Sequence, residues 1–204
     1  MGATAANALI ENPGLWRGEA LWRRDDWEVR LSDDDVDQLK SAVDGCSDRG
    51  AESIRKEDFQ LRALADRLSK VQRQLEEGAG FAFVRGLPME RFDEDQLRRL
   101  FWGIAIHLGT PVSQSASGER IFSVADAGYA ADDARSRGPN TSRKLSFHTD
   151  RCDVIGFCCH RQARSGGENY IVSSMALYNE ILERRSGLLA VLREPFYYLR
   201  HTVD

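Results

Sequence analysis

A stripe of apolar residues between positions 57 and 77 restricts the fold of this chain more than any other feature. Its members recur at spacings of three and four residues, which places them on one face of an α-helix: Leu61, Leu64, Leu68, Val71 and Leu75. Gly78 follows, and glycine commonly ends a helix. The stripe predicts a helix over about residues 57–77 that packs into a core; a coiled-coil partner face is the alternative.

Three further helices are marked by capping residues. Ser32 with Asp35 forms a capping-box-like start for a helix that ends at Gly45. Asp93 is the expected N-cap of a helix that ends at Gly109, and His107 in its last turn is expected to be a surface or capping residue. Ser173 or Ser174 is expected to cap a helix up to residue 185, and residues 188–194 add a short helical segment.

Strand-like stretches occupy the sequence between and after these helices. Apolar runs bounded by turn residues predict strands over residues 80–88, 119–128, 153–163 and 170–174, and at the start of 195–204. The polar stretch 129–143, with glycine and proline in it, predicts a loop long enough to border an active site. The first 30 residues are irregular and hold Trp16, Trp22 and Trp27.

Charge and composition exclude several classes of function. The chain has 204 residues and a net charge of -4, without the basic stripe that binding of nucleic acid needs. No apolar run approaches the roughly 20 residues of a membrane span, and the N-terminus does not look like a secretory signal. The four cysteines form no C-x-x-C pair. We expect buried or half-buried free thiols in a reducing cytoplasm.

His148 and Asp150 are the candidate metal ligands. On a strand, residues two apart project from the same face, so this imidazole and this carboxylate would point together while Thr149 points away. One further histidine would complete the 2-His-1-carboxylate site of non-haem Fe(II) oxygenases. A His and an Asp at this spacing also occur by chance, and a purely structural pair is the alternative.

Four stretches in order along the chain resemble the taurine dioxygenase-like (TauD/TfdA) group of Fe(II)- and 2-oxoglutarate-dependent dioxygenases. They are "GFAFVRGLP", "WGIAIHLGTPVSQ", "LSFHTDRCDV" and "QARSGGENYIVSSMALYNEIL". The resemblance covers about residues 13–204. It implies an α+β fold, a double-stranded β-helix (jelly roll) with flanking helices, incomplete at the C-terminus. Residues 1–30 would be an irregular segment, and residues 31–204 the N-terminal part of a single dioxygenase domain.

The same resemblance implies the site and the reaction. His148 and Asp150 would be the first two Fe(II) ligands, and Asn169 would stand near 2-oxoglutarate in place of the family's usual threonine. With O2, the enzyme would hydroxylate a small molecule and decarboxylate 2-oxoglutarate to succinate and CO2. The family's distal histidine and its arginine have no match here, since the neighbours of His160 and His201 differ from that motif. We therefore expect a truncated chain that is inactive alone.

Two other functions stay open from the sequence. In the first, the chain would be a non-catalytic degenerate half-barrel. It would act through homo-oligomerisation or a partner chain, because open sheet edges invite pairing. In the other, His148 and Asp150 hold zinc in a hydrolase with His160 as third ligand. The substrate is not readable. Basic residues of the long loop suit either an anionic substrate or a solvated loop: Arg135, Arg137, Arg143 and Lys144.

Overall fold

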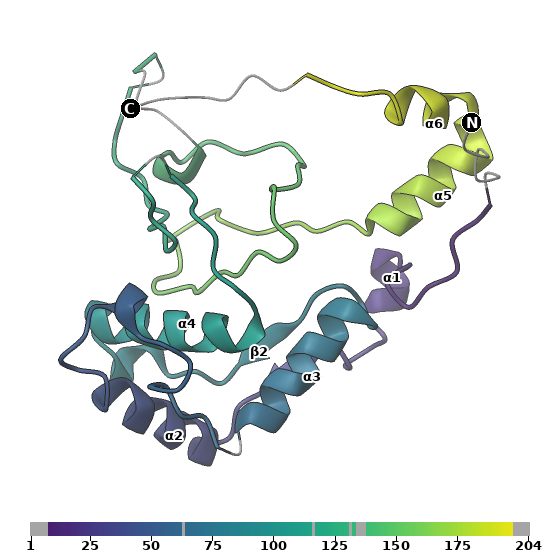
Figure 1. Ribbon diagram of the computed structural model, residues 1–204. Coiled ribbons are helices and arrows are strands. Elements are labelled where there is room, and N and C mark those ends of the chain that lie inside the picture. Colours follow the sequence, from purple (N-terminus) through teal and green to yellow (C-terminus); the bar gives the residue numbers. More distant parts are fainter. Residues whose placement is uncertain (1–7, 63, 116, 131, 134–137, 198–204) are drawn as a thin grey trace. The chain divides into compact units, whose positions relative to one another are not determined.

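The computed structural model describes residues 8–62, 64–115, 117–130, 132–133 and 138–197 (Figure 1). The chain divides into two compact units, which are described one at a time. Unit 1 comprises Met1–Val36, Ala63–Leu87 and Ala163–Tyr198. Unit 2 comprises Asp37–Arg62, Pro88–Gln162 and Leu199–Asp204. Each unit is therefore assembled from segments that are far apart in the sequence.

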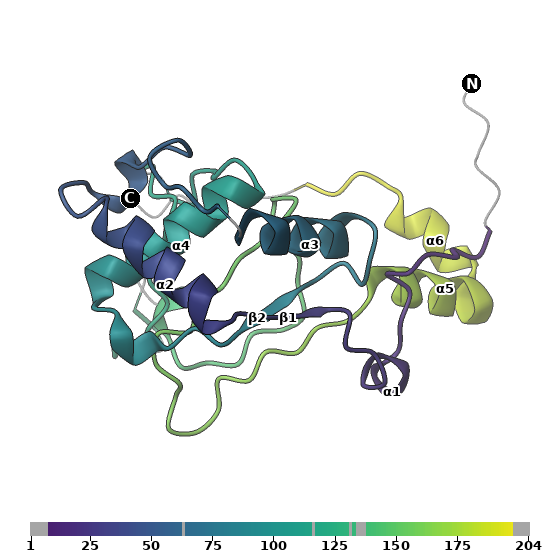
Figure 2. The same ribbon diagram turned by 90° about the horizontal axis from the view of Figure 1, so that it is seen from below.

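Unit 1 contains a small parallel sheet. Strand β1 (Glu28–Arg30) lies beside β2 (Phe83–Arg85) (Figure 2). In the register of this pair, Val29 lies opposite Val84. Helix α3 (Leu64–Glu76) precedes β2 in the sequence and contacts β1. Its buried residues belong to the predicted stripe: Leu64, Leu68 and Val71. The stripe thus packs into a core, as expected for an amphipathic helix of a globular protein.

The tryptophan-rich N-terminal segment is anchored to the residues that lead into β2. It carries the short helix α1 (Gly18–Leu21) before β1. The indole N–H of Trp16 donates to the carbonyl oxygen of Ala79 at 2.8 Å, so this buried polar group is satisfied. The rings of Trp16 and Phe81 meet edge to face, with their centroids 5.6 Å apart. The ring centroid of Trp27 lies 5.5 Å from that of Phe81. Aromatic packing thereby fixes a stretch that has little regular structure.

The last two helices complete unit 1. Helix α5 (Ser174–Arg185) is capped by Ser173, whose hydroxyl accepts from the N–H of Ala176 and donates to the carbonyl oxygen of Gly14 at 2.7 Å. The side-chain amide of Asn179 exchanges two hydrogen bonds with the backbone of Ile10. Helix α6 (Gly187–Leu192) follows directly and packs on α5. These bonds join the two ends of the described sequence within one unit.

Helix α4 (Glu94–Leu108) forms the centre of unit 2 together with the segment around residues 51–59. Asp93 is its N-cap, as predicted, and the structure adds a capping box between Asp93 and Gln96. The turn η1 (Ala51–Ser53) contacts α4, and the indole N–H of Trp102 donates to the carbonyl oxygen of Ile54 at 2.8 Å. Two more short turns, η2 (Met89–Arg91) and η3 (Gly138–Asn140), belong to this unit.

Phe59 is the largest fully buried side chain in the described part of unit 2. Its ring is fully buried, and a Cβ added at Gly103 would meet it at 2.5 Å. The Phe59 carbonyl oxygen lies 2.8 Å from Nε2 of His107, one turn further along α4. His107 is therefore half-buried and bonded to the backbone, which corrects the expectation of a surface or capping histidine. The absence of a side chain at Gly103 lets the ring lie directly against the helix.

Helix α2 (Asp33–Asp44) begins as the capping residues predicted. Asp35 accepts from both the N–H and the hydroxyl of Ser32, and the Asp35 N–H donates to that hydroxyl. Asp35 is buried and also pairs with Arg67 of α3. Burial by itself would raise the pKa of the Asp35 carboxyl, but the bonds from Ser32 and the charge of Arg67 outweigh it and lower that pKa.

The predicted helix over residues 57–77 begins only at Leu64. Arg62 has a φ of 31°, in the left-handed region that a helix cannot contain. Leu61 is nevertheless buried, so the apolar stripe extends beyond the helix. Periodicity identified the buried face correctly and placed the first residue of the helix wrongly.

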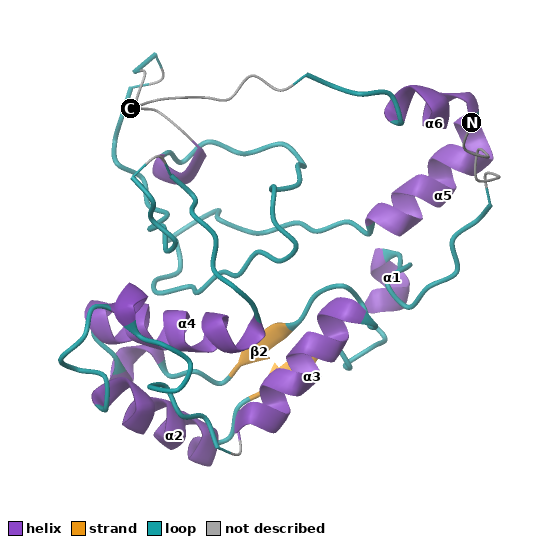
Figure 3. Cartoon of the chain, viewed as in Figure 1, coloured by secondary structure: helices purple, strands orange, loops and turns teal. Residues whose placement is uncertain are grey.

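Most of the predicted strands are not strands in the part of the chain that the structure describes. Only three residues of the stretch 80–88 form β2, and the described residues of the other stretches have no ladder partner (Figure 3). Large apolar side chains of these stretches are more than half exposed: Val154, Ile155, Phe157, Tyr170, Ile171 and Val172. Apolar pattern predicts a strand, but a strand exists only where a neighbour supplies hydrogen bonds. The expected jelly roll is thus not seen in the described residues.

Among the described residues, no helix combines the length and the apolar character that crossing a bilayer requires.

We predict that Gly103→Ala destabilises the protein by about 1–3 kcal/mol, because the added methyl group overpacks against the buried ring of Phe59. Denaturant unfolding measures the change. Gly187→Ala is the control, since nothing lies within 4 Å of its added Cβ at the start of α6. That variant should stay within about 1 kcal/mol of the parent protein. Equal effects of the two substitutions would show that the contact with Phe59 is unimportant.

We predict that Asp35→Asn lowers the free energy of unfolding at pH 7 by about 2 kcal/mol, a value reduced from that of a fully buried pair because Arg67 is partly exposed. The folded-state pKa of Asp35 lies below its ordinary value of 3.8, so its contribution is present above that pH and is lost as pH falls through the folded-state pKa. The gap between the two proteins should therefore narrow below about pH 4.

Asp34→Asn is the matched control, since Asp34 is an exposed acid in the same helical turn. Its effect should stay within about 0.5 kcal/mol. Denaturant unfolding at pH 7 and pH 3 gives both comparisons, and a gap that is the same at the two pH values would refute the assignment.

Candidate functional site

His148 lies in an exposed segment of unit 2 and is held by one hydrogen bond. Its Nδ1 is 2.7 Å from the carbonyl oxygen of Ser146. A carbonyl oxygen only accepts, so the neutral ring carries its proton on Nδ1 and has a lone pair on Nε2. This is the state in which a histidine binds a metal, with the second nitrogen fixed by a backbone acceptor.

Asp150 follows two residues later with an exposed carboxylate. Neither residue is part of a strand, so the alternation that a strand imposes does not orient them here. The structure brings His148 and Asp150 together only as near neighbours in one segment. Across the described ranges, no three His, Cys, Asp or Glu side chains come together as a set that could hold a metal ion.

The other described histidines form no site with this pair. His107 is bonded to the carbonyl oxygen of Phe59. His160 is exposed and lies outside any regular element. His201 falls outside the described residues, as do Arg135 and Arg137 of the long loop, while Arg143 and Lys144 are exposed.

Asn169, the candidate 2-oxoglutarate contact, belongs to unit 1. It is exposed and comes two residues after the Gly166-Gly167 pair. Both glycines have positive φ, 75° and 81°, a conformation that other residues rarely adopt. The two glycines therefore allow the backbone turn that leads to Asn169.

The four cysteines are free thiols in different surroundings. Cys46 is buried and Cys158 is half-buried, and burial raises the pKa of both thiols. Cys152 and Cys159 are exposed, which corrects the expectation that all four are at least half-buried. The predicted strand over residues 153–163 would have buried one face and its side chains. The structure does not form this strand in the described chain.

Two features of the structure had no signal in the sequence. The acceptor for His148 is a backbone carbonyl, which no residue pattern reveals. The other feature is a polar pocket in unit 2, lined by Gln38 and Arg62 among others. It lies between α2 and residues 58–62, which the sequence had assigned to the start of a second helix.

The sequence of residues 38–203 matches the sequence model of the family described as taurine catabolism dioxygenase TauD, TfdA family. The chain belongs to this family. The match includes His148, Asp150 and Asn169. Family membership implies a double-stranded β-helix fold. The described residues show several helices and one small sheet of two short strands.

Two curated relatives are similar to this chain. FR-33289 synthase of Streptomyces rubellomurinus is 27% identical over 183 residues, which is 85% of this chain and 54% of that protein. Taurine hydroxylase-like protein SAT17 of Stachybotrys chartarum is 28% identical over 192 residues, 90% of this chain and 50% of that protein. The chain thus spans about half the length of the curated relatives it matches.

Proposed function

We propose that this chain is part of an Fe(II)- and 2-oxoglutarate-dependent oxygenase that hydroxylates a small molecule and converts 2-oxoglutarate to succinate and CO2. The observation that carries the proposal is the hydrogen bond from His148 to the Ser146 carbonyl oxygen, which leaves Nε2 free two residues before Asp150. Membership of the TauD, TfdA family supports the same chemistry.

His148 and Asp150 are the residues that would hold the metal. The imidazole supplies a neutral nitrogen donor, and the carboxylate supplies an oxygen donor with one negative charge. This donor set suits a first-row metal that must keep open positions. Bound Fe(II) would supply the redox chemistry that couples O2 and decarboxylation to oxidation of a C–H bond.

The hydrogen bond to the Ser146 carbonyl oxygen prepares His148 for metal binding. It holds the proton on Nδ1 and limits rotation of the ring, so less ordering is needed on binding. Protonation of Nε2 competes with the metal for the same lone pair, and binding should therefore weaken as His148 becomes charged.

Asn169 would bind 2-oxoglutarate through its side-chain amide. The amide N–H₂ group donates to a carboxylate oxygen, as the hydroxyl of the family's usual threonine does. The third metal ligand and the arginine that the resemblance implies would come from sequence that the relatives have and this chain does not span. We therefore expect little turnover from these 204 residues alone.

We predict that Mn²⁺, used as an air-stable substitute for Fe(II), binds at His148 and Asp150. The readout is paramagnetic broadening of amide signals in NMR spectra of the full 204-residue chain. Broadening should centre on residues 146–151 and disappear in both His148→Ala and Asp150→Ala. Loss of one of two protein ligands should weaken binding by about tenfold or more.

His160→Ala is the matched control, since His160 is exposed in the same unit and is not a proposed ligand. It should leave the broadening unchanged. Loss of broadening in this variant would instead favour the zinc-type site that includes His160. A pattern that none of the three substitutions alters would exclude the proposed metal site.

We predict that Asn169→Thr keeps the affinity for 2-oxoglutarate and that Asn169→Val, of similar size, lowers it by about tenfold, because valine has no donor for the carboxylate. The measurement is titration of 2-oxoglutarate into the Mn²⁺-loaded chain, followed by NMR. Equal affinities for the threonine and valine variants would remove Asn169 from the site.

A further inference from the structure

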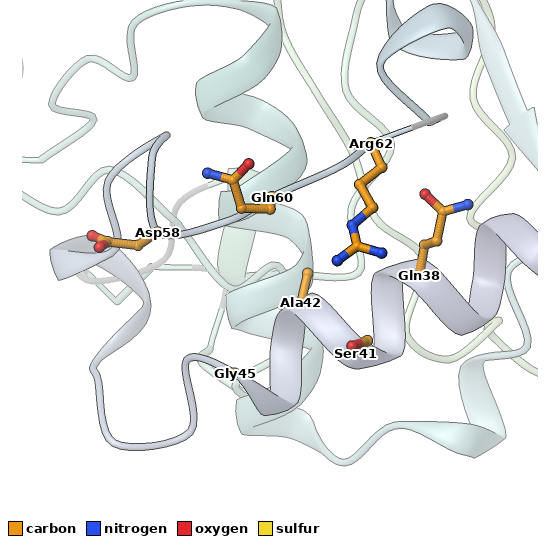
Figure 4. Close-up of a pocket in the computed structure, with 7 residues that line it drawn as sticks. All are labelled: Gln38, Ser41, Ala42, Gly45, Asp58, Gln60 and Arg62. Atoms are coloured by element: carbon orange, nitrogen blue, oxygen red, sulfur yellow. The ribbon is translucent and has the colours of Figure 1, made fainter.

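Unit 2 contains a polar pocket that none of the residues proposed for oxygenase chemistry lines. Its volume is about 230 Å³, and its walls are the second half of α2 and the segment from Asp58 to Arg62 (Figure 4). A cavity of about 150 Å³ holds benzene, so this one has room for a ligand of about ten non-hydrogen atoms. The pocket is therefore the size of a small metabolite.

One wall presents an acceptor without a partner. The side-chain oxygen Oε1 of Gln38 is buried and receives no hydrogen bond from any described residue. Buried polar atoms in folded proteins are almost always bonded, so an unpaired one calls for an explanation. A ligand with a hydroxyl or amino group would donate the missing hydrogen bond.

The opposite wall presents an arginine held in an unfavourable backbone conformation. Arg62 has a φ of 31°, and its guanidinium group points toward α2 between Gln38 and Gln60 (Figure 4). Within the described ranges, this guanidinium has no hydrogen bond or ion pair. Backbone strain of this kind concentrates at binding sites, where it positions a side chain.

The charge of the pocket is positive overall. Among the described residues that line it, Asp58 is the one acid, and its carboxylate pairs with Arg49 at 2.7 Å and with Nε of Arg55 at 3.1 Å. The bonds and charge of Arg55, and then of Arg49, lower the pKa of Asp58 and keep it ionised. The charge of Arg62 is left without compensation, and the hydroxyl of Ser41 lies on the helix below it (Figure 4).

We propose that this pocket binds a small hydroxycarboxylate. The carboxylate pairs with the guanidinium of Arg62 and accepts from the hydroxyl of Ser41, while the ligand's own hydroxyl donates to Oε1 of Gln38. A bidentate arginine and a separate acceptor together select a ligand that carries both groups. The site goes beyond the proposed oxygenase reaction, and neither depends on the other.

NMR titration of the full chain with L-malate tests the proposal, and succinate is the matched ligand with the same charge and no hydroxyl. L-malate should shift amide signals of residues 38–45 and 58–62, with succinate binding about tenfold more weakly. Shifts centred on residues 146–151 or 166–169 would report the proposed 2-oxoglutarate site instead and would not count as support. Absence of shifts in the pocket at 20 mM L-malate, roughly the limit of a weak specific site, would overturn it.

Two substitutions of the same kind separate the pocket from general attraction of anions. Arg62→Gln should abolish the shifts, and Arg73→Gln, which removes an exposed positive charge from α3 in unit 1, should preserve them. Equal loss in the two variants, or no loss in either, would refute a specific role for Arg62.

Arg62→Gly adds a readout that a merely structural arginine would not give. Glycine adopts a positive φ without strain, so this variant should melt at a temperature no lower than the parent protein while losing binding of L-malate. A folded variant that still binds, as judged by the same amide shifts, would exclude Arg62 as the anion contact.

Discussion

The contact between Phe59 and the bare backbone of Gly103 is the constraint on which unit 2 depends. A side chain at position 103 would overlap the ring, and the ring fills the space next to α4. The carbonyl oxygen of Phe59 is bonded to His107 further along the same helix, so backbone and side chain dock at two points. With residue 59 fixed in this way, the segment that follows it leads to Arg62 and one wall of the pocket.

The proposed oxygenase residues stand on a different kind of support. His148 and Asp150 lie in an exposed segment without strand partners, and the hydrogen bond to Ser146 is local. Loops commonly carry functional residues on a rigid scaffold, and the described residues near this pair supply few buried contacts. A metal bound by the two side chains would order a segment that local bonding leaves exposed.

Electrostatics act differently in the two parts of the chain. In unit 1, the buried Asp35 is matched by Ser32 and Arg67, so its charge contributes to stability at neutral pH. In unit 2, Asp58 is matched by two arginines while Arg62 has no partner among the described residues. In the first arrangement the acid and the arginine are paired with each other, and in the second Arg62 keeps a charge that a ligand could use.

The sequence by itself determined the family, the buried face of α3, and the caps at Ser32, Asp93 and Ser173, because these depend on neighbours within a few residues. It also identified His148, Asp150 and Asn169 as candidate site residues. Only the tertiary structure decided where α3 begins, that His107 bonds to Phe59, and which apolar stretches have strand partners. Those features depend on atoms brought together from distant positions, which no local pattern of residues encodes.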